Sequence, residues 1–191
     1  MLGRLRQLSA AHGSDLLEQI TLLPEKIQQA LQHSAAVARV AQKYAPTRSM
    51  LFLGRLANFP IALEGALKMK EITYIHAEGY PSAELKHGVI ALIDAGTPTV
   101  LIATRYGVYD KNLGSLQEIK ARGGPIIAVA AAGDSKIKGL ADAVLPVPKT
   151  HELLQPILNV IPLQLFSYHT AVALGRDVDK PRNLAKSVTV E

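Results

Sequence analysis

Short apolar runs alternate with longer helix-like segments along this chain, and this alternation most constrains its fold. The apolar runs are Met50–Leu53, Thr99–Ala103, Ile126–Ala130 and Ala143–Val147, and the helix-like segments are Pro60–Tyr74, Lys111–Arg122 and Pro156–Leu174. Strands that alternate with helices form a parallel sheet with helices on both faces. The sequence therefore predicts a three-layer α/β/α domain with a mainly parallel sheet. Ligands of such sheets bind beyond the carboxyl ends of the strands, which here points to Gly54 and the start of the Pro60 helix.

One domain is expected for the whole chain, because 191 residues that are 48% hydrophobic suffice for a single core. Residues 1–46 are predicted to form an N-terminal helical arm, with helical periodicity over Leu16–Leu31 and Ser34–Tyr44. Residues 47–175 form the predicted α/β core. Residues 176–191 are predicted to form an extended C-terminal tail.

The C-terminal tail carries residues that favour an ordered end. Pro181 ends the preceding structure, and Leu184, Val188 and Val190 supply apolar side chains that would attach the tail to the domain. Most termini are mobile, so a solvated end is the alternative interpretation. An attached tail would bring Lys186 to a substrate.

A stripe of charge runs along the helix predicted at Pro60–Tyr74. At about 100° per residue, Glu64, Lys68 and Glu71 fall within one arc of the helix. One interpretation is a solvent-facing ladder of ion pairs, the commoner use of this spacing. However, most of the remaining helix is apolar, which favours a buried stripe that is either a paired network or a site with shifted pKa values.

Glu84 and His87 lie three residues apart in Pro81–Ile93, on a short helix that is expected to end at Gly88. A Glu-x-x-His pair is half of a carboxylate-bridged dimetal site, but the chain has no second pair, so no metal is expected. A histidine near a sugar can instead move a proton close to neutral pH. Neither a GxGxxG nor a Walker glycine loop is present, and we expect no cofactor.

Composition excludes several classes of function. The chain has no cysteine, which excludes disulfides and a thiol nucleophile. Its net charge of +5 comes from dispersed residues with few aromatics, so nucleic acid is not an expected partner, and an anionic small molecule such as a sugar phosphate would suit this charge as well. The longest apolar run, Ile126–Ala132, is too short to cross a membrane. No apolar signal core follows Met1–Arg6, so a cytoplasmic location is expected.

Three segments together carry a resemblance to a known family: Ala62–Ile72 (ALEGALKMKEI), Ala83–Gly88 (AELKHG) and the tail Asp177–Glu191 (DVDKPRNLAKSVTVE). They resemble the C-terminal half of the isomerase domain of the glutamine:fructose-6-phosphate amidotransferases, which make glucosamine 6-phosphate from fructose 6-phosphate. The resemblance covers nearly the whole chain and implies the SIS, or sugar-isomerase, fold.

The resemblance also implies roles for individual residues. Lys186 matches the lysine that condenses with the carbonyl of open-chain fructose 6-phosphate. Glu71 matches the carboxylate that moves a proton between C1 and C2, and Lys68 matches a residue that assists it. His87 matches the histidine that opens the hexose ring and reaches the site from the neighbouring subunit, which implies a homodimer. The residues implied in substrate binding are Glu64, Arg182 and Ala185.

The chain also departs from the family pattern. The complete enzyme has a cysteine-dependent glutaminase and a first SIS half that grips the sugar phosphate, and neither is recognised here. We therefore expect the second half of a synthase, as a fragment or a short gene product, that is inactive alone in full synthesis. Leu56 replaces the glycine that usually follows Arg55, which would reshape the loop before Pro60. The alternative is a module that binds a hexose phosphate or dimerises without turnover.

Overall fold

Five parallel strands form one sheet in the centre of the molecule. The computed structural model describes residues 8–105 and 107–184. The strand order is β2-β1-β3-β4-β5, and neighbouring strands pair in parallel throughout. The strands are β1 (Ser49–Gly54), β2 (His76–Pro81), β3 (Thr99–Ile102), β4 (Ile126–Ala131) and β5 (Ala143–Val147). The predicted parallel sheet is confirmed.

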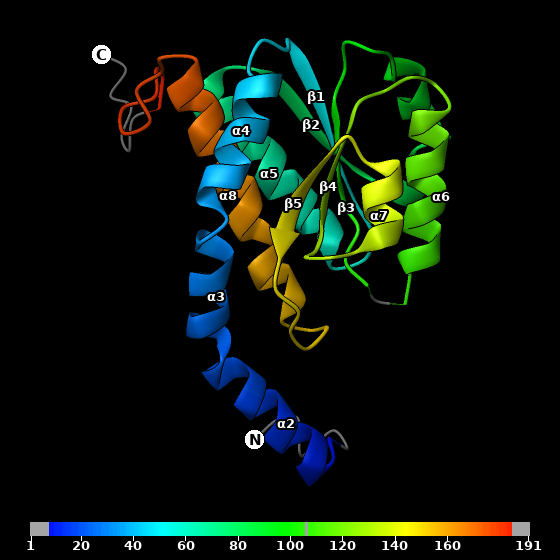
Figure 1. Ribbon diagram of the computed structural model, residues 1–191, viewed down its shortest axis with the longest axis vertical. Helices are drawn as coiled ribbons and strands as arrows, with labels where there is room; N and C mark the ends of the chain where they lie inside the picture. The colour runs from blue at the N-terminus through cyan, green and yellow to red at the C-terminus, as the bar shows by residue number, and fades with distance from the viewer. Residues whose placement is uncertain (1–7, 106, 185–191) are drawn as a thin grey trace, which may run out of the picture.

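Helices cover both faces of this sheet (Figure 1). One face carries α4 (Ser34–Tyr44), α5 (Asn58–Thr73) and α8 (Gln155–Ala173), and the other carries α6 (Tyr109–Lys120) and α7 (Ser135–Leu140). The central strands read as continuous apolar runs because both of their faces are covered. Met50 and Phe52 of β1 pack toward α5 and α8, whereas Leu51 and Leu53 pack toward α6.

Two further helices, α2 (Ala10–Thr21) and α3 (Leu23–Leu31), extend away from the sheet below α4 (Figure 1). The helical periodicity predicted over Leu16–Leu31 corresponds to two helices, because the chain breaks at Leu22. Pro24 lies in the first turn of α3, where its missing N–H costs nothing, but it cannot continue the hydrogen-bond ladder of a preceding helix.

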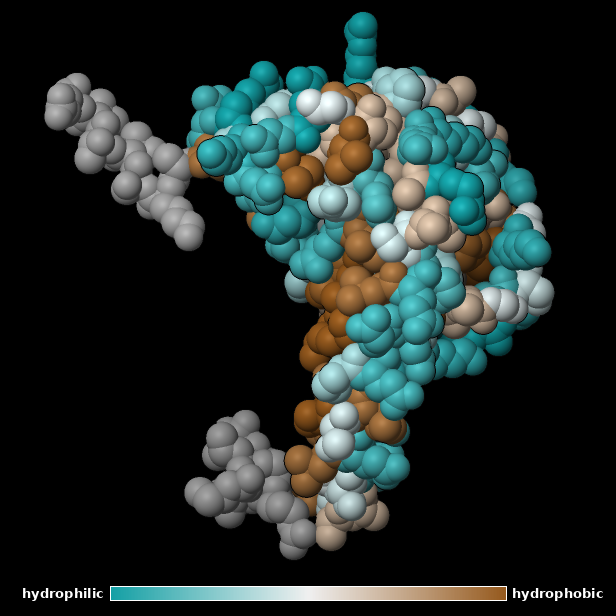
Figure 2. All heavy atoms as spheres, turned by 60° about the vertical axis from the view of Figure 1, so that its left-hand side comes forward, coloured by the Kyte–Doolittle hydropathy of each residue, from teal (hydrophilic) through white to brown (hydrophobic). Residues whose placement is uncertain are grey.

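The helices on the α2 side leave large apolar side chains exposed. Figure 2 shows hydrophobic surface running from the body of the molecule down these extending helices. Leu17 and Ile20 of α2 are 67% and 44% exposed, and Ile157 and Val172 of α8 are 45% and 53% exposed. No helix in residues 8–105 and 107–184 is long and apolar enough to span a membrane.

Strand β2 was not predicted from the sequence, and the short helix predicted near Glu84 is wrong. β2 is an edge strand with polar residues, so it lacks the apolar run that marks the central strands. It continues into a single 3-10 turn, Ser82–Glu84, followed by hydrogen-bonded turns up to Gly88 and a second 3-10 helix, Val89–Leu92. Gly88 has a φ of 129°, which suits glycine at this bend.

The turn after β1 requires a glycine. A Cβ on Gly54 would lie 2.0 Å from the carbonyl oxygen of Asn58, so no other residue allows α5 to begin this close to the strand. The next residue but one, Leu56, takes a φ of 51° and is 76% exposed. Leucine thus occupies a left-handed conformation that favours glycine, and the reshaping of the loop stays a prediction.

Candidate functional site

The predicted stripe on α5 is a paired network. Lys68 Nζ donates a 2.7 Å hydrogen bond to Glu71 Oε2 and lies 3.8 Å from Glu64 Oε1. The three side chains are 36%, 26% and 36% exposed, so the expectation of a buried stripe is wrong. The reason is that α5 is covered on one side only: Leu63 and Leu67 are also 44% and 41% exposed.

The ion pairs of Lys68 with Glu71 and Glu64 favour the charged form of Lys68. The hydrogen bond to Glu71 raises the pKa of Lys68 above its usual value, against the opposing effect of burial. Lys68 is therefore an ammonium at neutral pH and presents a proton to the Glu71 carboxylate. Pairs this exposed contribute only about 0–1 kcal/mol each to stability. The hydrogen bond holds Lys68 Nζ beside Glu71 Oε2.

His87 lies in the turn after Glu84 and is exposed. Its Nδ1 is 2.6 Å from Glu84 Oε2, and the two side chains are 71% and 55% exposed. Lys86 Nζ lies 2.9 Å from Glu118 Oε1 of α6, and Leu85 packs into the core on the α6 side. The predicted Glu84–His87 pair is thus present, on the α6 side of the sheet.

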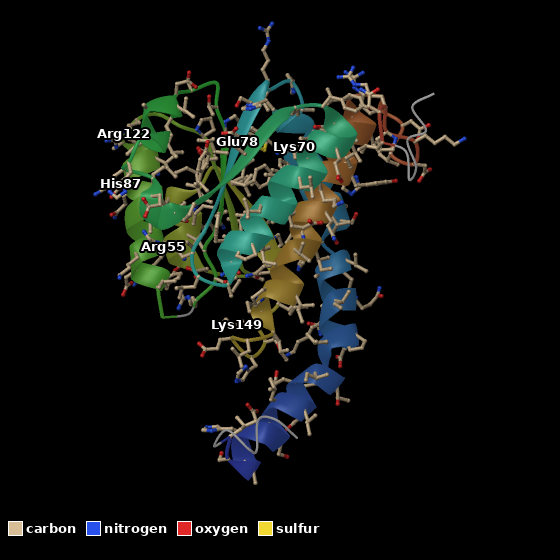
Figure 3. The ribbon with its side chains drawn as sticks, turned by 180° about the vertical axis from the view of Figure 1, so that it is seen from behind. Arg55, Lys70, Glu78, His87, Arg122 and Lys149 are labelled. Atoms are coloured by element: carbon tan, nitrogen blue, oxygen red, sulfur yellow. The ribbon has the colours of Figure 1, made fainter. Side chains whose placement is uncertain are left out.

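A single copy of the chain does not bring His87 to Glu71. α5 packs through Ala66 and Met69 on the opposite face of the sheet from Leu85. Figure 3 shows the same separation, with His87 beside α6 and Lys70 on α5. A site that uses both residues therefore requires a second copy.

The described part of the C-terminal tail contacts the end of α5. The backbone N–H of Arg182 donates a 2.9 Å hydrogen bond to the hydroxyl of Tyr74, and the Arg182 guanidinium lies 4.0 Å from the centre of the Tyr74 ring. The tail is therefore attached at Arg182, and the predicted attachment through Leu184 is wrong, because Leu184 is 55% exposed. Ala185 and Lys186 lie outside the described residues.

Sequence reasoning missed a buried polar network at the carboxyl edge of the sheet. Asn159 Nδ2 donates to Asn58 Oδ1 at 2.8 Å and to Thr104 Oγ1 at 3.2 Å, and Gln155 Nε2 donates to Asn159 Oδ1 at 2.9 Å. The four residues come from three distant segments, so no local pattern marks them. They occupy the position after β1 and β3 where ligands of such sheets bind, beside a cavity of about 250 Å³ lined by Thr104 and Arg105.

A second missed cluster lies after β3 and β4. Arg105 Nε donates to Asp134 Oδ2 at 2.7 Å, and the Tyr109 hydroxyl is 2.8 Å from both carboxylate oxygens. The hydrogen bond from Arg105 holds the pKa of Asp134 well below its usual range. Among residues 8–105 and 107–184, no cluster of three or more His, Asp or Glu side chains has the geometry of a metal site.

Comparisons with known proteins identify the family of this chain. A family model described as SIS domain matches residues 43–174. The isomerizing glutamine–fructose-6-phosphate aminotransferase of Thermus thermophilus is 53% identical over 190 residues, which are 99% of this chain and 32% of the relative. The enzyme of the same name from Aquifex aeolicus is 51% identical over 177 residues, 93% of this chain and 30% of the relative. This chain thus spans about a third of the length of these relatives.

Solved structures show the same relationship. The C-terminal domain of glucosamine-fructose-6-phosphate aminotransferase from Francisella tularensis superposes with a TM-score of 0.84 at 37% identity, over 92% of this chain and 49% of that chain. A sugar-phosphate isomerase fold from Listeria monocytogenes, at 15% identity and a TM-score of 0.66, covers 90% of this chain and 95% of that chain and supports the fold alone.

A parallel sheet between two helical layers, matched by the SIS model over most of its length, defines a sugar-isomerase domain. The chain belongs to the SIS domain family. Within that family, the resemblance to the isomerizing aminotransferases stated from the sequence is confirmed.

Proposed function

We propose that this chain is the isomerase-half domain of an isomerizing glutamine:fructose-6-phosphate aminotransferase. In this role it handles fructose 6-phosphate and gives glucosamine 6-phosphate. The observation that carries the proposal is the Lys68–Glu71 pair on α5, with the start of the C-terminal tail attached at the end of the same helix. Identity of about half to relatives of that name, over nearly the whole chain, supports it.

The proposed chemistry has a covalent and a proton-transfer step. The neutral amine of Lys186 adds to the C2 carbonyl of the open-chain sugar, and water leaves as the imine forms. The imine withdraws electrons and acidifies the C1 hydrogen. Ammonia from the glutaminase replaces the lysine nitrogen in the imine, and Lys186 leaves as its free amine. Glu71 takes the C1 proton and returns it to C2, which converts the resulting 2-imine of the ketose to the 2-amino aldose. The Lys68 ammonium, 2.7 Å from Glu71, orients that carboxylate.

Substrate contacts in this proposal come from the same region. Glu64 lies on the α5 stripe beside Lys68, and Arg182 and Ala185 belong to the tail that follows it. Arg182 brings a permanent positive charge, which suits a phosphorylated sugar. The proposal includes the glutaminase and the first SIS half as the partners that supply ammonia and the main phosphate grip. The cytoplasmic location stays a prediction.

A homodimer is part of the proposal, with His87 of one copy serving the Glu71 site of the other. The separation of the two residues by the sheet supports it, as do the exposed apolar residues Leu17 and Ile20 on α2. Light scattering at micromolar concentration is expected to give the mass of two chains. A monomer mass would contradict this assembly.

The test uses the Thermus relative with its matching part replaced by this chain, so that the missing parts are supplied. Fructose 6-phosphate and borohydride should label the protein, since hydride reduces the imine to a stable amine. Lys186→Ala should abolish the label. Glu71→Gln should still be labelled but should exchange the C1 hydrogen with solvent about 10²- to 10⁴-fold more slowly.

Two control variants change the charge in the same way as Lys186→Ala and Glu71→Gln, but at other exposed positions. Lys70→Ala removes an exposed lysine of α5, and Glu25→Gln alters an exposed carboxylate of α3. Both should retain labelling and exchange. Labelling of Lys186→Ala at this domain, or normal exchange by Glu71→Gln, would refute the assigned chemistry. Binding of the sugar phosphate without either reaction would favour the non-catalytic module.

A further inference from the structure

Tyr74 ends α5 in an unusual conformation. Its φ and ψ are 66° and 13°, and its backbone N–H donates to the carbonyl of Lys70 at 3.2 Å. The left-handed region is rarely occupied by bulky residues, and glycine is the usual residue at such a helix end. A tyrosine that keeps this backbone therefore points to a use for its side chain.

The tail reaches Tyr74 through a defined series of turns. Gly175, with a φ of 65°, ends α8 and reverses the chain. Asp177 Oδ1 then accepts hydrogen bonds from the backbone N–H groups of Asp179 and Lys180 at 2.9 and 3.0 Å. Such side-chain bonds to the following backbone close a local turn. Pro181 follows and fixes its own φ, so the path to Arg182 is restricted.

Three contacts then meet on the single Tyr74 side chain. The hydroxyl accepts the backbone N–H of Arg182 at 2.9 Å, and the guanidinium of Arg182 lies 4.0 Å from the ring centre. The guanidinium of Arg176 lies 5.2 Å from the same ring centre. Both cations are within the range in which an aromatic face attracts a cation. The hydroxyl holds the main chain itself, so it fixes the course of the tail.

We propose that Tyr74 is a positioning residue that anchors the C-terminal tail beside the charged stripe of α5. The inference rests on the proposed function, because Lys186 is the residue it serves. Lys186 follows Arg182 by four residues, and four residues of extended chain span at most about 14 Å. The anchor at Arg182 therefore limits where Lys186 can act. Glu71 precedes Tyr74 by three helical residues, about 4.5 Å along the axis. The anchor and the proton carrier therefore share one end of one helix.

The contacts fit positioning better than a contribution to global stability. Arg176 and Arg182 are exposed, and Tyr74 is only half-buried. Removing exposed contacts changes the free energy of unfolding little, whereas it releases the segment that they hold. Loss of the anchor should thus free the tail while the core stays folded.

The first measurement is hydrogen exchange of the Arg182 backbone amide in this chain, by NMR. Tyr74→Phe removes the hydroxyl but keeps the ring, and should speed exchange about tenfold, as expected for one lost hydrogen bond. Tyr74→Leu also removes the aromatic face and should speed it about 50-fold. Tyr168→Phe, which alters another half-exposed tyrosine on α8, is the matched control and should leave the exchange unchanged. Circular dichroism should be the same in all variants.

The second measurement is borohydride labelling in the Thermus relative that carries this chain. Tyr74→Leu should label about tenfold more slowly than the wild type, and Tyr74→Phe should lie between the two, because labelling follows the fraction of attached tails. The saturating rate should fall more than the apparent affinity for fructose 6-phosphate, which a purely structural defect would not produce.

The outcomes separate the inference from the function on which it rests. Absence of labelling in the wild type would refute the proposed function. Labelling in the wild type with an unchanged rate in Tyr74→Leu would refute the positioning role alone. Unchanged exchange of the Arg182 amide in Tyr74→Leu would refute the anchor itself.

Discussion

Replacing Asp134 should cost more stability than replacing any exposed carboxylate. Its side chain is 2% exposed and accepts hydrogen bonds from Arg105 Nε and Nη2 at 2.7 and 3.1 Å. It also accepts the Tyr109 hydroxyl at 2.8 Å and caps α7 by accepting the backbone N–H of Ile137 at 3.3 Å. One carboxylate thus joins the loops after β3 and β4 to the start of a helix.

The size of the effect follows from these partners. Loss of an N-cap costs about 1 kcal/mol, and hydrogen bonds to a charged group contribute about 1.5–3 kcal/mol. Arg105 is 48% exposed, so water rehydrates its guanidinium when the carboxylate is removed. The summed loss of stability therefore stays near the lower end of these contributions. Asp134→Ala should lower the free energy of unfolding by about 3 kcal/mol, which corresponds to roughly 6–12 °C in Tm for a chain of this size. Asp134→Asn keeps the cap and should lose about 2 kcal/mol.

The same cluster predicts a dependence on pH. The pKa of Asp134 is held well below its usual range, mainly by the hydrogen bond from Arg105. A carboxyl whose pKa is lowered by folding stabilises the protein above its unfolded pKa of about 4 and loses this contribution as the pH falls toward the folded value. The difference between wild type and Asp134→Asn should therefore be constant above about pH 5 and shrink at pH 3.

Urea unfolding at pH 7, 5, 4 and 3 measures this difference directly. Asp15→Asn is the matched control, because Asp15 is an exposed carboxylate of α2, and it should change the free energy of unfolding by less than about 0.5 kcal/mol. Equal stability of Asp134→Asn and wild type at pH 7 would refute the reasoning. A difference that persists unchanged at pH 3 would refute its electrostatic part.

Two substitutions with opposite expected effects on stability test the backbone strain at Leu56 and the close packing at Gly65. Leu56→Gly should raise Tm by about 1–4 °C, because the left-handed backbone at a φ of 51° costs leucine about 1–2 kcal/mol and glycine's extra unfolded-state entropy offsets about half of that. A lower Tm would show that the loop is not strained. Gly65→Ala should lower the free energy of unfolding by about 1–3 kcal/mol, since its Cβ would lie 2.8 Å from Leu163 Cδ1 and 3.0 Å from Phe52 Cδ1. An increase in stability, as helix propensity alone predicts, would contradict that crowding.

The strands that were predicted are apolar runs: β1, β3 and β4 lie inside the sheet, and β5 is an edge strand with an apolar sequence. β4, Ile126–Ala131, is apolar at every position because helices cover both of its sides, and such a run is visible in the sequence. β2, His76–Pro81, has a neighbour on one edge only and keeps His76 and Glu78 on its surface, so the same signal is absent. Pairing with β1 determines this strand, and that information is not local.

Some features of the candidate site could likewise be predicted from the sequence, and others could not. The Lys68–Glu71 pair was predictable because the helical repeat brings residues three apart together. Its exposure was not, because that depends on which neighbours cover α5. Nothing in the sequence marks Tyr74 as the partner of Arg182, 108 residues later, although the chain does show a proline and apolar residues able to hold a tail. Contacts between distant segments are the part that requires the fold.

The sheet also determines how the C-terminal tail and His87 lie relative to Glu71. α5 carries Glu71 and Tyr74 on one face, and the turn with His87 lies on the other, so no side-chain motion within one copy joins them. The tail, however, starts at the end of α8, which packs directly on α5, and needs only the turns from Gly175 to Pro181 to reach Tyr74. Attachment of the tail is therefore a property of a single chain, whereas the proposed delivery of the histidine would be a property of an assembly. Dilution below the dimer dissociation constant should separate the two, with the Arg182 amide still protected when any contribution of His87 is lost.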